Sequence, residues 1–366
     1  MEFNIARSTF YEVLKNQLIF NLKYYRELYM IKYIVTFSII IVFLIIFLLI
    51  RLSDFDLSGY EQQRSISFKH NNDVLVGTLI LPSSEVSPPV VLLVHGDGSQ
   101  DRWSNGGYIP LVKFLVSQGI AVFSWDKPGV GESRGNWLAQ TMSDRAEEAV
   151  LALKKVREQP ELKKSRGGYL GFSQAGWVVP QASQLTKTEF AVLIGGAINW
   201  RSQDIYYTGQ RLKAEGRSLN DIQNAKKHEA LAFDRQFTEA AAVIPCNSEC
   251  MRQDFERMNA LADATKDISN THTPVLILMG KDDRNVDADE TVAVWGKVLP
   301  AGTPRCIRQL PGATHGLLRS EWFDYQLSSQ WPLWKQGVFL LSGRYSYSPN
   351  ALRTVSSWIL NQNCVV

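Results

Sequence analysis

The stretch Gly171-Phe172-Ser173-Gln174-Ala175-Gly176 decides how this chain folds, because it follows the apolar run 168–170 directly. A short strand that ends in Gly-x-Ser, before small residues that open a helix, places a serine hydroxyl on a sharp strand-to-helix turn. Small neighbours are needed because the strand and the helix pass close together there. The stricter pattern, Gly-x-Ser-x-Gly, has glycine where this chain has Ala175. We therefore expect Ser173 to lie exposed on a strained turn.

An acidic residue and a histidine follow that serine along the chain, each after an expected strand. The apolar run 274–280 leads into Asp282 and Asp283, and an expected strand over 305–310 leads toward His315. Serine, acid and histidine in this order, each at the carboxyl end of a strand, are typical of a catalytic triad. Taken singly, the histidine could be a loop residue without a partner, and the aspartates could serve a turn. Their joint placement favours the triad.

A further strand end supplies a candidate oxyanion site. The expected strand 88–94 leads into His95-Gly96-Asp97-Gly98. A carbonyl under attack becomes an oxyanion, which needs two N–H donors already in place. We expect one from the backbone of Gln174 and one from the backbone of Asp97, since glycine lets the backbone approach a substrate. The alternative is that Asp97 and Gly98 only form a turn. We interpret His95 as a structural residue that fixes this loop.

These motifs give the chain a resemblance to a known superfamily. From about residue 61 to the C-terminus it resembles the α/β-hydrolases, above all bacterial esterases and serine-aminopeptidase-like members. The segment 123–133 is similar to the family loop Asp-x-Arg-Gly-x-Gly-x-Ser, with Lys127-Pro128 where Arg-Gly is commoner. The family's acid usually lies in Gly-x-x-Asp-x-x-Val, and residues 280–286 fit this pattern with Asp283. The resemblance thus implies a triad of Ser173, Asp283 and His315.

The remaining pattern predicts an α/β fold with a mostly parallel central sheet and helices on both faces. Beyond the strands above, we expect a hairpin over 64–68 and 74–81, strands over 120–125, 168–172 and 190–196, and helices over 107–118, 143–158, 174–185 and 350–362. Between about 199 and 272 the alternation stops and polar helical sequence takes over. In this family, an insertion there forms a helical cap, which shields a site from water.

A segment rich in aromatic residues separates His315 from the last expected helix. It carries Trp322, Phe323, Tyr325, Trp331, Trp334, Phe339, Tyr345 and Tyr347. Core packing, the wall of an apolar acyl pocket, and contact with a membrane interface, where Trp and Tyr are favoured, all remain open from the sequence.

The N-terminal part predicts a membrane anchor. Residues 33–50 contain no charge and are closed by Lys32 and Arg51. A bilayer core of ~30 Å needs about 20 apolar residues in a helix, so this run can just span it. The rival, a cleaved signal peptide, would have a shorter apolar core and an Ala-x-Ala-like site. We expect a cytoplasmic segment over 1–32, a transmembrane anchor over 33–50, a linker over 51–60 and a hydrolase domain over 61–366.

Basic residues set the expected orientation. Five precede the span, and few lie close after it: Arg7, Lys15, Lys23, Arg26 and Lys32 come before, Arg51 and Arg64 after. This bias predicts a cytoplasmic N-terminus and a catalytic domain on the extracytoplasmic side of the membrane.

The four cysteines bear on the same question, because an exported domain can hold disulfides. Cys246 and Cys250 form the possible bridge, and a Cys306–Cys364 bridge is a further option. Four free thiols in a cytoplasmic-facing domain are the alternative. The Cys-x3-Cys pair lacks the partner ligands of a zinc site.

Taken together, the sequence predicts a membrane-tethered serine hydrolase that cleaves carboxylic esters of small molecules. It implies no metal and no organic cofactor, and a net charge of +3 without a basic run gives no sign of nucleic-acid binding. Three alternatives stay open: a peptidase or amidase on the same triad, an acyltransferase, and a non-catalytic binding protein that retains the fold. The sequence does not address the oligomeric state.

Overall fold

The computed structural model describes residues 2–60, 62–83 and 87–365. The chain divides into two compact units, Met1–Ser53 and Asp54–Val366. Residue 61, where we expect the hydrolase domain to begin, lies outside the described residues. We describe the two units separately below.

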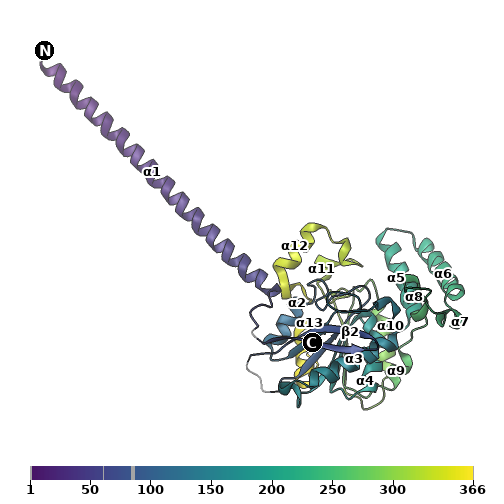
Figure 1. Ribbon diagram of the computed structural model, residues 1–366. Coiled ribbons are helices and arrows are strands. Elements are labelled where there is room, and N and C mark those ends of the chain that lie inside the picture. The colour runs from purple at the N-terminus through teal and green to yellow at the C-terminus, as the bar shows by residue number, and fades with distance from the viewer. Residues whose placement is uncertain (1, 61, 84–86, 366) are drawn as a thin grey trace. The chain divides into compact units, whose positions relative to one another are not determined.

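The first unit consists of helix α1, Glu2–Leu52, which is 51 residues long (Figure 1). At 1.5 Å per residue this helix is about 75 Å long, more than twice the ~30 Å of a bilayer core. By length and composition it can cross a membrane. The uncharged run 33–50 lies within it, so the residues before that run continue the same helix. Apolar side chains along the run, such as Phe43 (68% exposed) and Leu49 (64%), are open to the surroundings.

The second unit contains one eight-stranded sheet in the order β1-β2-β4-β3-β5-β6-β7-β8. β2 is antiparallel to both of its neighbours, and the other neighbouring strands are parallel. The strands are β1 Gln63–His70, β2 Asp73–Ile80, β3 Val90–Val94, β4 Ala121–Trp125, β5 Gly167–Phe172, β6 Phe190–Ile194, β7 Val275–Gly280 and β8 Arg305–Leu310. The predicted strands are all present, and their carboxyl ends from β3 to β8 meet at one edge.

The sheet has a hydrophobic core on each face, because its central strands are apolar on both sides. In β3, Val90, Leu92 and Val94 belong to one core, and Val91 and Leu93 belong to the other. The helices that pack on the first face are α3 Met142–Arg157, α4 Val179–Leu185, α9 Thr265–Ser269 and α10 Ala288–Val298; those on the second are α2 Ile109–Ser117 and α13 Ala351–Asn361. Figure 1 shows this three-layer arrangement.

Two helical segments extend the sheet region. Between β6 and β7 lie α5 Trp200–Ala214, α6 Leu219–Gln236, α7 Glu239–Ala242 and α8 Arg252–Asn259, followed by α9. Between β8 and α13 lie α11 Ser320–Phe323 and α12 Leu333–Ser342. Short 3-10 turns complete the chain: η1 Ser53–Phe55, η2 Trp137–Ala139, η3 Pro160–Leu162, η4 Ser173–Gly176, η5 Ser328–Gln330 and η6 Gly343–Ser346.

Several helix boundaries differ from the sequence expectation, most of all in the region 174–185. The helix predicted over 174–185 is interrupted: η4 comes first, and α4 starts only at Val179. Pro180 explains the break, because proline fits the first turn of a helix but not its interior. Helix α3 begins after Thr141, whose side chain forms a capping box with Asp144, rather than at Ser143.

The four cysteines pair as two disulfides. Cys246 and Cys250 close a short loop before α8. Cys306, buried in β8, pairs with Cys364 after α13, so the C-terminal end of the chain is fastened to the sheet.

Candidate active site

Ser173 lies at the turn between β5 and η4, and its backbone φ is +51°. A residue with a side chain rarely adopts this left-handed conformation, and such strain concentrates at functional sites. The turn is tight: a Cβ atom added at Gly171 would lie 2.7 Å from the Cβ of Ala175. One at Gly176 would collide with the carbonyl oxygen of Ala197. Gly171, which has no side chain, therefore leaves room for Ala175 at the position where the stricter Gly-x-Ser-x-Gly pattern has glycine.

His315 and Asp283 are joined by a hydrogen bond of 2.8 Å between Nδ1 and Oδ2. The Asp283 side chain has no exposed surface, and its other oxygen accepts from the backbone N–H groups of Asn285 (2.7 Å) and Val286 (2.9 Å). Asp282 instead accepts from the hydroxyl of Ser320 at 2.6 Å. Of the two adjacent aspartates, the structure thus brings Asp283 to the histidine.

Burial acts to lower the pKa of His315, but the charge of Asp283 and the hydrogen bond that its carboxylate accepts from the ring outweigh burial and raise this pKa above its ordinary value. The ring still has 21% of its side-chain surface exposed. An imidazole held in this way presents Nε2 outward, because Nδ1 is occupied by the carboxylate. The imidazole can accept a proton at Nε2. When it gives that proton away, it returns to its starting tautomer and can accept a proton again.

The loop after β6 connects the serine to the histidine. The carbonyl oxygen of Ser173 accepts from the N–H of Ala197 at 3.2 Å. Gly195, two residues earlier, has a φ of +60°, and a Cβ atom there would lie 2.8 Å from Nδ1 of His315. Ser173 and His315 therefore flank one short loop at the carboxyl edge of the sheet.

The loop His95–Gly98 lies directly against Ser173, as a Cβ atom on Gly96 would be 3.2 Å from the serine Cβ. His95 is buried; its Nε2 lies 2.6 Å from the carbonyl oxygen of Trp125, and its ring stacks on Tyr108. Burial, followed by the charge of Lys127, lowers the pKa of His95 to about 3. His95 is therefore neutral near pH 7 and has a structural position, as the sequence indicated.

Two buried basic side chains hold the carbonyl groups of this loop. Lys127 donates to the carbonyl oxygens of Gly96 (2.6 Å) and Gly98 (2.9 Å), and Arg145 donates to that of His95 (2.5 Å). In a planar trans peptide the N–H points opposite to the C=O. The Asp97 N–H therefore points away from Lys127, to the opposite side of the loop, where it can donate to an oxyanion.

The two residues expected to donate to an oxyanion also contact each other. The Gln174 side-chain amide lies 3.3 Å from a carboxylate oxygen of Asp97, and its carbonyl oxygen accepts from Arg145. Arg145 thus contacts both the Gln174 side chain and the loop that begins at His95, so the two strand ends are held in register.

The segment between β6 and β7 touches the site on two sides. Tyr206 of α5 donates its hydroxyl proton to the carbonyl oxygen of Asp283 at 2.7 Å. Arg252, at the start of α8, pairs with the carboxylate of Asp97 at 2.9 Å. Gln326, from the second insertion, donates to the carbonyl oxygens of Tyr207 and Arg284 at 3.0 Å each. Both insertions therefore brace the loop that carries Asp283.

Sequence reasoning missed Lys127, Arg145, Arg252 and Tyr206 as site residues. Lys127 gave a signal, since it departs from the family loop, but its partners are carbonyl groups distant in the sequence. Arg145 looked like an ordinary residue of a helix start. Arg252 and Tyr206 lie in polar helical sequence, where nothing marks the one side chain that reaches the site.

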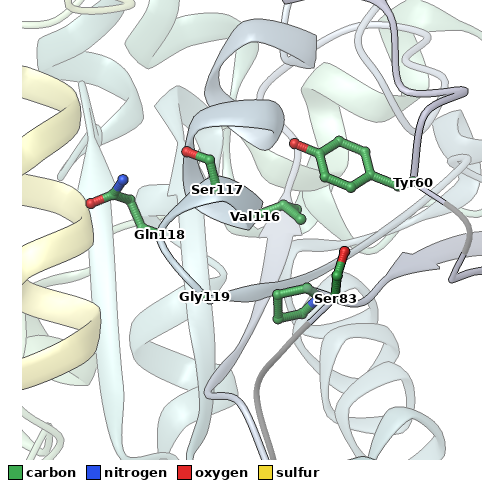
Figure 2. Close-up of a pocket in the computed structure, with 7 residues that line it drawn as sticks. Tyr60, Ser83, Val116, Ser117, Gln118 and Gly119 are labelled. Atoms are coloured by element: carbon green, nitrogen blue, oxygen red, sulfur yellow. The ribbon is translucent and has the colours of Figure 1, made fainter.

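A cavity of about 550 Å³ lies elsewhere, and Figure 2 shows its lining. Its walls are Tyr60, Pro82, Ser83 and the end of α2 with the turn after it, residues 116–119. Gly119 comes just before the amino end of β4, whereas Ser173 follows the carboxyl end of β5. Strands β4 and β5 point the same way, because both are parallel to β3. The cavity is thus at the opposite edge of the sheet, and we assign it no part in the chemistry.

Comparison with known proteins identifies the family. The profile described as "Serine aminopeptidase, S33" matches residues 87–321, well over half of the chain. The protein therefore belongs to this family of α/β-hydrolases, and the predicted fold class and relationship are confirmed. No match was found among curated protein sequences.

Solved structures agree on the fold. A hypothetical protein from Pseudomonas aeruginosa is 16% identical with a TM-score of 0.51, over 79% of this chain and 96% of that one. DcsB, solved with its substrate analogue, is 12% identical with a TM-score of 0.50, over 69% and 91%. Est1E from Butyrivibrio proteoclasticus, solved with ferulic acid, is 16% identical with a TM-score of 0.49, over 76% and 98%. At such identities the likeness to the first two of these structures shows the fold alone.

Proposed function

We propose that this α/β-hydrolase is a membrane-tethered serine hydrolase that cleaves carboxylic esters through an acyl-enzyme. Ser173 is the nucleophile, His315 the general base and then the general acid, and Asp283 the residue that orients the imidazole. The backbone N–H groups of Asp97 and Gln174 stabilise the tetrahedral oxyanion. The segment over about 199–272 acts as a cap on the site.

The reaction runs in two half-reactions. The Ser173 oxygen forms a bond to the acyl carbon while His315 Nε2 takes the hydroxyl proton. The C–O bond to the alcohol then breaks, and His315 gives that proton to the leaving alkoxide. Water next attacks the acyl-enzyme, His315 takes a proton from it, and the acid product leaves as the serine is reprotonated.

One observation carries the proposal: the 2.8 Å bond between Asp283 and His315 lies at the sheet edge where Ser173 occupies its strained turn. Burial of the Asp283 carboxylate and its two backbone donors fix the acid. An oriented imidazole at the same sheet edge as a strained serine is the arrangement that acyl transfer needs, and it supports an enzyme over a binding protein.

The first test is covalent trapping. The full-length protein in detergent is treated with a fluorophosphonate and digested, and the labelled peptide is identified by mass spectrometry. We expect the label on Ser173, with none on a Ser173→Ala variant of equal thermal stability. Absence of label on a folded wild type would sink the triad assignment and favour a non-catalytic role.

A peptidase or amidase on the same residues is the second candidate, because the matching family is described as serine aminopeptidase. A p-nitrophenyl ester and a p-nitroanilide with the same acyl group separate the two. We expect a much larger kcat/KM for the ester than for the anilide. A comparable kcat/KM for the anilide would move the protein to the amidases, and product formation only with an added alcohol would indicate an acyltransferase.

We further propose that α1 anchors the protein with the domain outside the cytoplasm. The helix is long and apolar enough to span a bilayer, and two disulfides suit an oxidising compartment. Protease added to intact cells should digest the domain, whereas protection until lysis would place it in the cytoplasm. An N-terminus lost from the mature chain would identify α1 as a signal sequence instead.

A further inference from the structure

Helix α12 (Leu333–Ser342) is apolar, yet none of its residues is buried. Leu333 is 83% exposed, Trp334 63% and Leu340 44%. Leu333, Gly337 and Leu340 follow each other at spacings of four and three, which places them on one side of a helix. Trp334 lies beside them. The α12 face, as we call these four residues, is therefore an apolar surface without a covering among the described parts of the domain.

The other side of α12 is fixed to the domain. The Phe339 ring lies 5.9 Å from that of Phe323, which is 1% exposed, and 5.5 Å from that of Trp331. These aromatic contacts hold the helix from within, so the α12 face keeps a defined direction outward. The predicted aromatic segment thus divides between packing and an exposed surface.

The beginning of the domain is attached to the same helix. Asp54 accepts from the backbone N–H of Arg344 at 3.0 Å, and the Phe55 ring lies 5.4 Å from that of Phe339. Gly343, with a φ of +50°, leaves no room for a Cβ atom beside the Asp54 carboxylate. Since α1 ends at Leu52, two residues of chain, at most about 7 Å, separate it from the α12 contacts.

We propose that the α12 face lies in the interface of the bilayer that α1 spans; this inference rests on the anchorage proposed above. The covalent connection is short, because only Ser53 lies between the end of α1 and Asp54, which contacts the turn directly after α12. Trp and Leu on one face suit the boundary between headgroups and acyl chains. Lys335 lies 4.5 Å from the centre of the Trp334 ring and provides a cation at headgroup depth.

Site-specific fluorescence on the full-length protein tests the proposal. An environment-sensitive dye is attached to a single new cysteine, Leu333→Cys, in vesicles of phosphatidylcholine and phosphatidylglycerol that contain a doxyl-labelled quencher lipid. Leu219→Cys is the matched control, because Leu219 on α6 is 82% exposed against 83% for Leu333. Val42→Cys, within the uncharged run of α1, reports on the anchor itself. Hydrolysis of a soluble short-chain ester is measured on each sample.

We expect strong quenching at positions 42 and 333, several times that at 219. Quenching at 42 but not at 333 would overturn the α12 proposal and leave the anchor intact. A dye at 333 that both lipid quencher and aqueous iodide fail to reach would show a protein cover, such as a second copy, and would equally overturn it. Loss of quenching at 42 would remove the anchor and the inference together. Absent ester hydrolysis with the expected quenching would refute the enzymatic proposal alone.

Discussion

The two carboxylate oxygens of Asp97 each lie 2.9 Å from a guanidinium nitrogen of Arg252. Asp97 belongs to the loop against Ser173, and Arg252 is the first residue of α8 in the segment between β6 and β7. Burial acts to raise the pKa of Asp97, but the hydrogen bond and charge of Arg252 keep this pKa below its usual value. The pair is therefore ionised at neutral pH and connects the proposed cap to the proposed oxyanion site.

Removing this connection should affect catalysis more than folding. We expect Arg252→Gln to lower kcat roughly tenfold, because the Asp97 N–H loses part of its positioning. The side chains are 45% and 42% exposed, so the free energy of unfolding should change by at most about 1 kcal/mol. Steady-state kinetics and urea denaturation measure the two quantities.

The control is Arg211→Gln, which breaks an exposed pair between Arg211 of α5 and Glu215 directly after that helix. It should leave kcat unchanged. Because salt screens exposed ion pairs, higher ionic strength should lower kcat of the wild type toward that of Arg252→Gln and leave the variant's own kcat constant. Equal kcat for the wild type and Arg252→Gln would show that the pair does not position the loop.

The two adjacent aspartates should differ sharply when each is replaced. Asp283→Asn leaves the size of the side chain but removes the charge that orients His315, so kcat should fall roughly 100- to 10,000-fold. Asp282→Asn removes the charge of a side chain that accepts from the hydroxyl of Ser320, a bond that the amide oxygen can still accept, so kcat should stay within about threefold of the wild type. Comparable losses for the two variants would contradict the assignment of Asp283 as the acid.

The pH dependence of kcat/KM should report His315. The imidazole must be neutral to accept the serine proton, so activity falls as pH drops through its pKa. Since Asp283 raises that pKa above its ordinary value of 6.5, the acid limb of the wild type should centre above pH 6.5. Residual activity of Asp283→Asn should show a limb moved to lower pH. A wild-type limb centred below 6.5, or one that does not move, would count against the proposed pair.

The fold could be predicted from the sequence because its main signals are local. Five-residue apolar runs such as Val90–Val94 identify buried parallel strands, and glycine or proline marks their ends. The mostly parallel sheet was predicted from the alternation of strands and helices, whereas the order of its strands comes only from the structure. The break before Val179 was not predicted, because the residues around Pro180 otherwise have the pattern of one continuous helix.

Residues of the candidate site could be predicted only where a serine, an acidic residue or a histidine closely follows a predicted strand. Asp283 and His315 met that condition. Lys127 and Arg145 did not, because their role depends on carbonyl groups of His95–Gly98 that the fold brings near from distant sequence. Backbone acceptors carry no sequence signature. The sequence also left three roles open for the aromatic segment: core packing, a pocket wall and membrane contact. Choosing among them required the exposure of Leu333 and its neighbours, which composition alone does not give.

The two disulfides should contribute unequally to stability. A cross-link limits the unfolded chain more when it closes a longer loop, and the separations here are 58 residues for Cys306–Cys364 and 4 for Cys246–Cys250. The chain-entropy relation gives about 4 kcal/mol for the first and about 2 kcal/mol for the second. Replacing each pair by alanines, C306A/C364A or C246A/C250A, and unfolding both variants in guanidinium chloride measures the difference. We expect the larger loss in the free energy of unfolding for C306A/C364A, because this variant releases the end of the chain from β8. Equal losses would contradict the argument from loop length. No loss of stability on reduction of the wild type would mean that the bridges do not form in the mature protein, and would remove a support for the extracytoplasmic location.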